Sequence, residues 1–214
     1  TPAEIKVMEA FAEHAAVALT KARLFQDIQD RRRVSEELYT LTVSMMRSMD
    51  LRQRVDTFVR GAQEALRFDR ISVLLPDGDG TALEVAASTE EDPAARRAVS
   101  IAGSGAIERA WQTGETALIL SDADLAALPP LAPELAAHPL LGATRFAAVP
   151  LRFQEQTIGV VLADNTRSRR NVTRRGVAQL ELFCQQLQSL VSNAGLWAET
   201  QRRERDATLL VEVT

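Results

Sequence analysis

The stretch RFAAVPLRFQEQTIGVVLADN (residues 145–165) decides the fold of this chain. It contains two apolar runs, 145–153 and 156–165, separated by a short polar connection. Runs rich in Val, Ile, Leu and Phe favour β-strands, and a connection this short joins neighbouring strands into a hairpin. We therefore predict an antiparallel hairpin here.

The residues upstream predict more strands and a long loop. ISVLLP (71–76) and TALEVAAS (81–88) flank the turn DGDG, which is a second hairpin signal, and TALILSD (116–122) is typical of a strand. SIAGSGAIERAWQTG (100–114) predicts a strand end, a turn, and a short helix with Ser104 as its N-cap and Gly114 as its stop. EEDPAARR favours a loop or short helix, and residues 123–142 hold four prolines, so we expect a lid-like loop there.

Amphipathic helices precede and follow these strands. Asp50 is a suitable N-cap, and one apolar face follows it, made of Leu51, Val55, Phe58, Val59, Ala62 and Leu66. A second helix is expected from about Thr173 to beyond Arg205. Helices outside an antiparallel sheet define an α+β layer fold.

The opening segment of the chain is repeated at its end. Residues 4–42 align with 176–214 without a gap at a constant offset of 172, so that Phe11 meets Phe183 and Leu24 meets Leu196. A repeat of this length indicates an array of similar units. We expect a piece of a longer relay protein: 1–33 as the terminal helix of a preceding unit, 34–49 as a continuous linker helix, 50–200 as one domain, and 201–214 as the start of the next linker.

The N-terminal helix is expected to be long and to pair with a second copy. From Pro2 to Met49 there is no Gly and no further Pro, and apolar residues recur every three or four positions, with a slip of phase around residues 31–33. This pattern favours a homodimer through paired helices. The alternative is a helix that packs partly on its own domain and is otherwise solvated. The expected seam is Leu24, Ile28, Val34, Leu38, Leu41 and Met45.

Composition excludes several classes of protein. A net charge of −4 gives no global attraction to nucleic acid or to an anionic membrane, and no apolar run approaches the ~20 residues of a membrane span. One cysteine permits neither an internal disulfide nor a cysteine-cluster metal site. With no export signal visible, we expect a cytoplasmic protein.

The order of four segments resembles a GAF domain over about residues 50–200. They are LLPDGDGTALEVAAS, GAIERAWQTGETALILSD, RFAAVPLRFQEQTIGVVLADN and QLELFCQQLQSLVSNAGLW, and residues 4–33 resemble the last helix of a preceding GAF domain. The resemblance implies a PAS-like antiparallel sheet of about six strands, with the first and last helices on one face and a small-ligand pocket on the other.

GAF domains commonly serve as sensor and dimerisation modules in bacterial signalling proteins. The resemblance therefore implies a non-catalytic module that relays a signal through paired helices to a neighbouring GAF or output domain, such as a kinase, cyclase or ATPase in a two-component system. The alternatives are a receptor for a small ligand, cyclic nucleotide or chromophore, and a ligand-free structural spacer.

The motifs for specific pocket chemistries are incomplete. Asn165 matches the Asn of a cyclic-nucleotide signature, but Thr166 replaces its Lys, Val172 stands where its Phe is expected, and no acidic pair follows. Cys184, the only thiol, lies in mid-helix and is expected to be a buried apolar group, which disfavours a bilin attachment site or a free-methionine sulfoxide reductase.

Metal, haem and hydrolytic sites are also not predicted. His14 and His138 are far apart in sequence, and a lone loop histidine such as His138 is more often exposed. Gly103–Ser104–Gly105 lacks the nucleophile-elbow pattern. What remains is a non-covalent small ligand, for which we expect contacts from Trp111, Asp122, His138, Arg145 and Phe146. The alternative for Trp111 and Phe146 is core packing.

One basic loop stands apart from these motifs. TRSRRNVTRR (166–175) holds five arginines and no acid. A contact with phosphate or nucleic acid is one interpretation. The favoured one is a solvated loop that meets an acidic surface of a neighbouring domain, and residues 90–92 (EED) are a candidate for such a surface.

Overall fold

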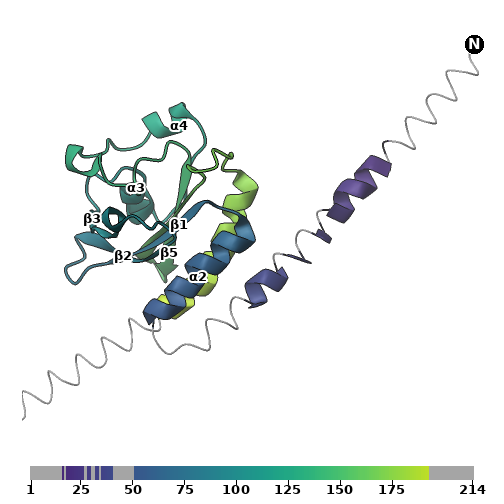
Figure 1. The fold of residues 1–214 in the computed structure, drawn as a ribbon, viewed down its shortest axis with the longest axis horizontal. Coiled ribbons are helices and arrows are strands. Elements are labelled where there is room, and N and C mark those ends of the chain that lie inside the picture. Colours follow the sequence, from purple (N-terminus) through teal and green to yellow (C-terminus); the bar gives the residue numbers. More distant parts are fainter. Residues whose placement is uncertain are drawn as a thin grey trace, which may run out of the picture. The chain divides into compact units, whose positions relative to one another are not determined.

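The computed structural model describes residues 16, 18–26, 28–29, 32–33, 35–40 and 51–192. It divides into two compact units, Thr1–Thr40 and Leu41–Thr214, which are considered separately (Figure 1). The expected N-cap Asp50, residues 41–49 of the linker, and residues 193–214 of the C-terminal repeat lie outside the described residues.

The described residues of the first unit are all helical. In the expected seam, Leu24 is 57% exposed and Ile28 is 63% exposed, and Leu38 is half-buried. The neighbouring Phe25 is 61% exposed. The other seam positions, Val34, Leu41 and Met45, lie outside the described residues. This helix therefore presents large apolar side chains on its surface.

The second unit is built on a six-stranded antiparallel sheet with the strand order β3-β2-β1-β6-β5-β4. The strands are β1 (Arg70–Pro76), β2 (Ala82–Ser88), β3 (Val99–Ser100), β4 (Ala117–Ile119), β5 (Phe146–Phe153) and β6 (Gln156–Asp164). Both predicted hairpins are present, as the pairs β1–β2 and β5–β6. The predicted α+β fold class is confirmed.

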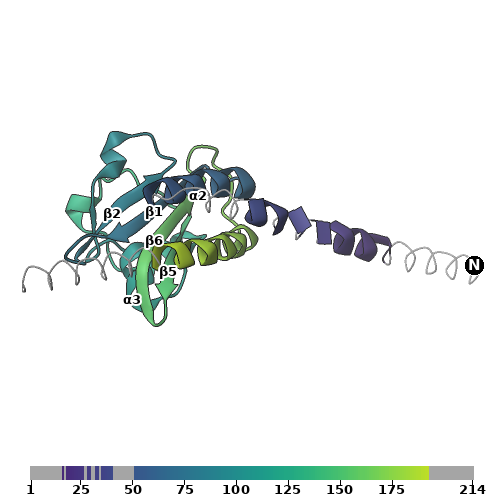
Figure 2. The ribbon, with the colours of Figure 1, turned by 90° about the horizontal axis from the view of Figure 1, so that it is seen from below.

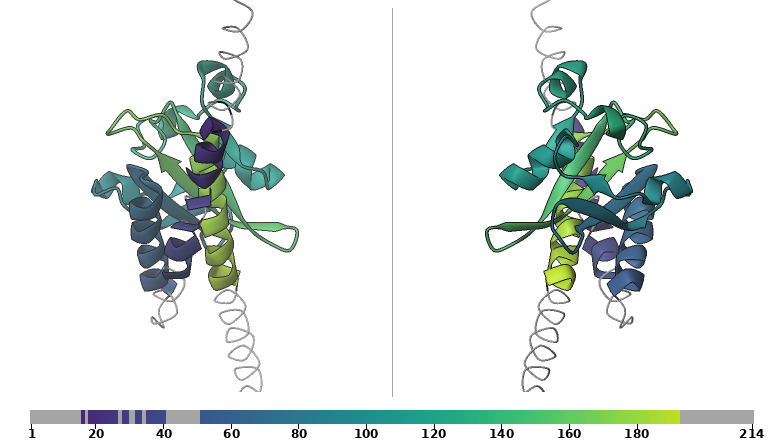
Figure 3. Two further views of the ribbon diagram at one scale, coloured as in Figure 1. Left: turned by 90° about the vertical axis from the view of Figure 1, so that its right-hand side faces the viewer. Right: turned by 90° about the vertical axis from the view of Figure 1, so that its left-hand side faces the viewer.

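Helices cover both faces of this sheet. The helix α2 (Leu51–Leu66) and the helix over residues 174–192 lie on one face (Figure 2). In α2 the buried side chains are four of the six predicted ones, Val55, Phe58, Val59 and Ala62. The C-terminal helix buries Leu180, Phe183, Cys184 and Leu187. The helix α3 (Ala106–Thr113) crosses the opposite face (Figure 3). The sheet is therefore the middle of three layers.

Two local predictions around α3 and β4 are wrong. The N-cap of α3 is Gly105, because the buried Ser104 hydroxyl donates to the Ile101 carbonyl (2.6 Å) instead of accepting from the helix. Residue 122 does not extend β4 but begins the short helix α4 (Asp122–Ala126). Ser121 and Asp124 form a capping box that starts this helix. Gly114 does end α3, in the left-handed conformation.

The connections are otherwise as the sequence indicates. Residues 90–97 contain the short 3-10 helix η1 (Pro93–Arg96), and the proline-rich stretch after α4 contains only η2 (Pro133–Leu135). No helix in the described part of the chain is both long enough and apolar enough to cross a membrane.

Candidate functional site

A long lid segment, defined as residues 127–145, joins α4 to β5 over the α3 side of the sheet. Its first half is attached to the turn before α3: the Ala132 amide donates to the Gly103 carbonyl (2.8 Å), and Leu131 forms a bridge with Ser104. Gly103 has φ +75°, and a Cβ there would lie 2.8 Å from the Ala132 Cβ. Only glycine allows this close approach.

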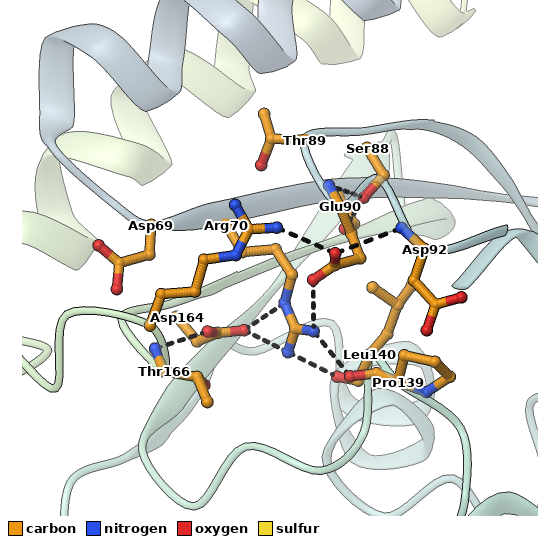
Figure 4. A network of polar contacts seen from close by, with 12 residues as sticks. Asp69, Arg70, Ser88, Thr89, Glu90, Asp92, Pro139, Leu140, Asp164 and Thr166 are labelled. Atoms are coloured by element: carbon orange, nitrogen blue, oxygen red, sulfur yellow. Dashed lines mark hydrogen bonds and ion pairs between the residues drawn. The ribbon is translucent and has the colours of Figure 1, made fainter. Parts of the chain in front are cut away.

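The second half of the lid segment is held by Arg70, the first residue of β1 (Figure 4). Its guanidinium donates to the Pro139 carbonyl (2.7 Å) and the Leu140 carbonyl (3.4 Å) of the lid. It also pairs with the Asp164 carboxylate at the end of β6 (2.5 Å). Arg70 is 7% exposed and Asp164 is 3% exposed. A buried ion pair of this kind is compatible with folding because its polar atoms are hydrogen-bonded.

Glu90 completes this Arg70 network, which comprises Arg70, Glu90, Asp164, Pro139 and Leu140. Glu90 lies 3.5 Å from the Arg70 guanidinium and accepts from the Arg167 guanidinium at 2.9 Å. Burial acts to raise the pKa of Glu90, but the amides of residues 91 and 92 and the Arg167 charge outweigh it and lower that pKa. The carboxylate is therefore ionised at neutral pH. The network joins β1, β6, the loop after β2, and the lid.

His138 is a further attachment of the lid, and it is buried, contrary to the expectation of an exposed loop histidine. Its Nδ1 accepts from the Leu140 amide (3.3 Å), so its Nε2 carries the proton and donates to the Arg97 carbonyl (3.2 Å). Burial is the main reason that the pKa of His138 is lowered. The ring is thus neutral and fully used in holding the lid.

An apolar cluster fills the space between the lid, α3 and the sheet. Leu135 and Leu140 of the lid join Ile107 and Ala110 of α3 in it. Trp111 and Phe146, expected as ligand contacts, pack against this cluster as partly buried side chains, which fits the core-packing alternative. The Thr157 hydroxyl also donates to the Trp111 carbonyl (2.9 Å) and fixes α3 to β6.

The five expected ligand contacts are not all brought together. Asp122 and Arg145 form an ion pair at 2.7 Å, and Arg145 directly precedes Phe146 at the start of β5. The ring of His138 is engaged elsewhere, with Arg97 and Leu140. Sequence reasoning did not select Arg70 or Asp164. The sequence feature that could have indicated them is a charged residue at one end of each of two buried apolar strands.

The basic loop makes its acidic contacts within the same domain. Arg167 pairs with Glu90 at 2.9 Å, and Arg170 pairs with Asp69 at 3.0 Å. Burial acts to raise the pKa of Asp69, but hydrogen bonds from Ser168 and Arg170 lower it. Glu90, one of the acidic residues considered as a contact surface for this loop, thus contacts the loop within the same domain. Asn165, the remnant of the cyclic-nucleotide signature, accepts from the Asp69 amide (2.9 Å) and has a structural role in this loop.

Cys184 is buried, as expected, and burial raises the pKa of its thiol. A thiol of this kind is a poor nucleophile because the reactive thiolate is disfavoured. Among the described residues, no group of three or more His, Cys, Asp or Glu side chains is placed to hold a metal ion.

One hydrogen bond connects the α3 side of the sheet with the helix layer on the other face. The Thr116 hydroxyl, in the turn between α3 and β4, donates to the Glu181 carboxylate of the C-terminal helix at 2.6 Å. Glu181 is half-buried beside the core residues Leu180 and Phe183. The turn after α3 and the C-terminal helix are therefore in direct contact.

Comparison with known proteins identifies the fold. The sequence pattern of the GAF domain matches residues 50–193, about two thirds of the chain. The chain belongs to the GAF-domain family. No curated protein matches the chain.

Solved structures with the same fold come from proteins of several kinds. Residues 122 to 287 of a methyl-accepting chemotaxis protein are similar with a TM-score of 0.64 and 21% identity, covering 73% of this chain and 98% of that one. The GAF domain of a phosphoenolpyruvate-protein phosphotransferase from Coxiella burnetii gives 0.62 and 17%, covering 78% and 98%. Free methionine-R-sulfoxide reductase from Neisseria meningitidis gives 0.58 and 19%, covering 74% and 88%. At these identities the likeness shows the fold alone.

Proposed function

We propose that this chain is a sensory module that passes a change at its α3 and lid side to its C-terminal helix. The observation that carries the proposal is the Thr116–Glu181 hydrogen bond, which links the two sides of the sheet. The presence of the same fold in a chemotaxis protein and in GAF domains of phosphotransferases supports a sensory role.

The contacts around α3 give this coupling a physical route. Ile107 and Ala110 bury the helix in the same apolar cluster as Leu135 and Leu140 of the lid. A movement of the lid therefore changes the packing of α3, and the turn after α3 is hydrogen-bonded to Glu181. A ligand or neighbouring domain shifts such an equilibrium only if it prefers one of two packing states.

Self-association through the N-terminal helix is the second part of the proposal. Leu24, Phe25 and Ile28 are exposed and fall within about 100° of one helix face, at 100° per residue. Pairing with a second copy would bury them. We propose further that the segments before and after the domain connect it to a preceding GAF unit and to an output domain.

The experiment that tests the relay has two stages. A thermal-shift screen with cyclic nucleotides, haem, bilins and small metabolites identifies a ligand, and saturation at a hundredfold excess over Kd stabilises the fold by about 2.7 kcal/mol. Hydrogen exchange of residues 174–192 is then compared with and without that ligand. We expect the ligand to slow exchange in this helix.

The variant Thr116→Val removes the hydroxyl and keeps the shape of the side chain. It should bind the ligand but lose most of the effect on residues 174–192, whereas Thr81→Val, in the exposed β1–β2 turn, should behave as the wild type. An equal effect in Thr116→Val and wild type would exclude this route. The absence of a shift with every ligand would favour a ligand-free spacer.

A further inference from the structure

A basic recess lies where β6 ends and β5 begins, beside the lid but outside the apolar cluster. It has a volume of about 320 Å³ and is lined by Arg145 and Thr144 of the lid and by Thr166, Arg169, Arg170 and Asn171 of the basic loop. Every described residue lining it is cationic or neutral, and none is acidic. Its size is at the lower end of the range for small-molecule sites, ~300–1,000 Å³.

The positive charge of this recess is incompletely balanced. Arg145 pairs with Asp122, but 91% of the Asp122 side chain is exposed, so this pair is weak in water. Arg170 pairs with Asp69, which is not among the residues that line the recess. Within the described part of the chain, Arg169 makes no side-chain hydrogen bond or ion pair. An anion in the recess would therefore find at least one uncompensated guanidinium.

Hydrogen bonds hold the loop in place both before and after Arg169. The Thr166 amide donates to Asp164 (2.9 Å), the Ser168 amide donates to Asp69 (2.5 Å), and the Arg170 guanidinium donates to the Arg67 carbonyl (2.6 Å). Arg169 itself has φ +56°, a left-handed conformation that is unfavourable for a residue with this side chain. A strained residue that the surrounding contacts fix is a mark of functional sites. The loop is thus organised before any ligand arrives.

The neutral groups of the recess match the same kind of ligand. Thr144 and Thr166 offer hydroxyl groups and Asn171 offers an amide, and among the described residues these three side chains have no hydrogen-bond partner. Arginine binds phosphate through two parallel hydrogen bonds, and hydroxyl and amide donors complete the coordination of its oxygens. We propose that this recess binds the phosphate group of a small phosphorylated molecule or of inorganic phosphate. The site does not depend on the proposed relay, because binding is measured at the recess itself.

The test is a calorimetric titration of the whole chain with inorganic phosphate and with ribose 5-phosphate, at an ionic strength held constant with sodium chloride. We expect saturable binding to the wild type by at least one of them. Equal affinities would identify phosphate itself as the ligand, and tighter binding of ribose 5-phosphate would identify a phosphomonoester.

The decisive variant is Arg169→Asn, because asparagine tolerates the left-handed conformation while the charge is lost. It should weaken phosphate binding about tenfold, the effect of one charge-assisted contact. Asn171→Asp places a carboxylate in the recess and should abolish binding. Arg109→Gln, exposed on α3 and away from the recess, is the matched control and should bind as the wild type. Absence of saturable binding, or equal binding by all four proteins, would overturn the proposal.

Discussion

Arg70 exchanges the hydration of its guanidinium for two carboxylates and two carbonyl oxygens. The Asp164 and Glu90 carboxylates and the carbonyls of Pro139 and Leu140 surround a side chain that is almost completely buried. Removal of one partner from such a cluster leaves charge without solvation, which costs more than the pair contributes in net stability. The lid is therefore held by Arg70, and a substitution of Arg70 alone leaves its charged partners unsolvated.

Arg70→Met should lower the free energy of unfolding by about 3–5 kcal/mol, because it leaves Asp164 buried and unpaired. Urea denaturation followed by circular dichroism measures this loss. The double variant Arg70→Met/Asp164→Leu removes both charges and should recover part of the stability. A single variant within about 1 kcal/mol of the wild type would show that the ion pair is solvated in solution.

His138 should make stability depend on pH below neutrality. Burial lowers its pKa from the ordinary 6.5, so the unfolded chain takes up a proton at a higher pH than the folded one. Stability from this group is complete above about pH 6.5 and is lost as the pH falls below it. The advantage of the wild type over His138→Gln should shrink between about pH 7.5 and 5.5 in urea denaturation. Parallel profiles of wild type and His138→Gln would contradict the assignment.

At the scale of the element, Gly159 shows how closely the central strands approach. It lies in β6 between β1 and β5, and a Cβ there would come within 2.8 Å of the Leu74 carbonyl oxygen and the Leu75 side chain, and 3.1 Å from Leu151. A backbone oxygen held in the sheet cannot move aside as the end of a flexible side chain can. The small residue is therefore a packing requirement of the sheet.

Gly159→Ala should reduce the free energy of unfolding by about 1–3 kcal/mol, the usual cost of overpacking a core. Gly78→Ala in the β1–β2 turn is the matched control, since nothing lies within 4 Å of the added Cβ and it should be close to neutral. Both values come from urea midpoints. If the two variants were equally stable, the strands would have room to separate at this position.

The elements themselves were largely predictable, because they are local. Alternating and β-branched runs gave both hairpins, and the four buried residues of α2 follow from its period. The prediction of Ser104 as an N-cap was wrong because its hydroxyl can bond either the helix amides or the Ile101 carbonyl. In the fold Ser104 is buried and bonds Ile101, and this burial is not evident from the sequence. The helix α4 was not predicted because Ser121, which begins its capping box, directly follows an apolar run that is typical of a strand.

The site was less predictable for the same physical reason. Arg70 and Asp164 are 94 residues apart and Arg70 and Pro139 are 69 apart, so no local pattern brings them together. Trp111 and Phe146 pack against the apolar cluster under the lid, but a sequence gives no means to tell a core aromatic from a ligand contact. The arginines of the basic loop were evident, whereas their partners Glu90 and Asp69 required the fold.

For the whole molecule, the proposed pairing of N-terminal helices is open to a direct test. The described helix exposes Leu24, Phe25 and Ile28, and burial of such side chains is worth ~1.5–3 kcal/mol each, enough to favour association when several pair. Ile28→Asp places a charge in this face and should shift sedimentation-velocity profiles from dimer to monomer. Gln26→Asp adds the same charge on roughly the opposite face, about 160° away at 100° per residue, and should remain a dimer. A wild type that sediments as a monomer at every concentration, or two variants that dissociate equally, would contradict pairing through this face.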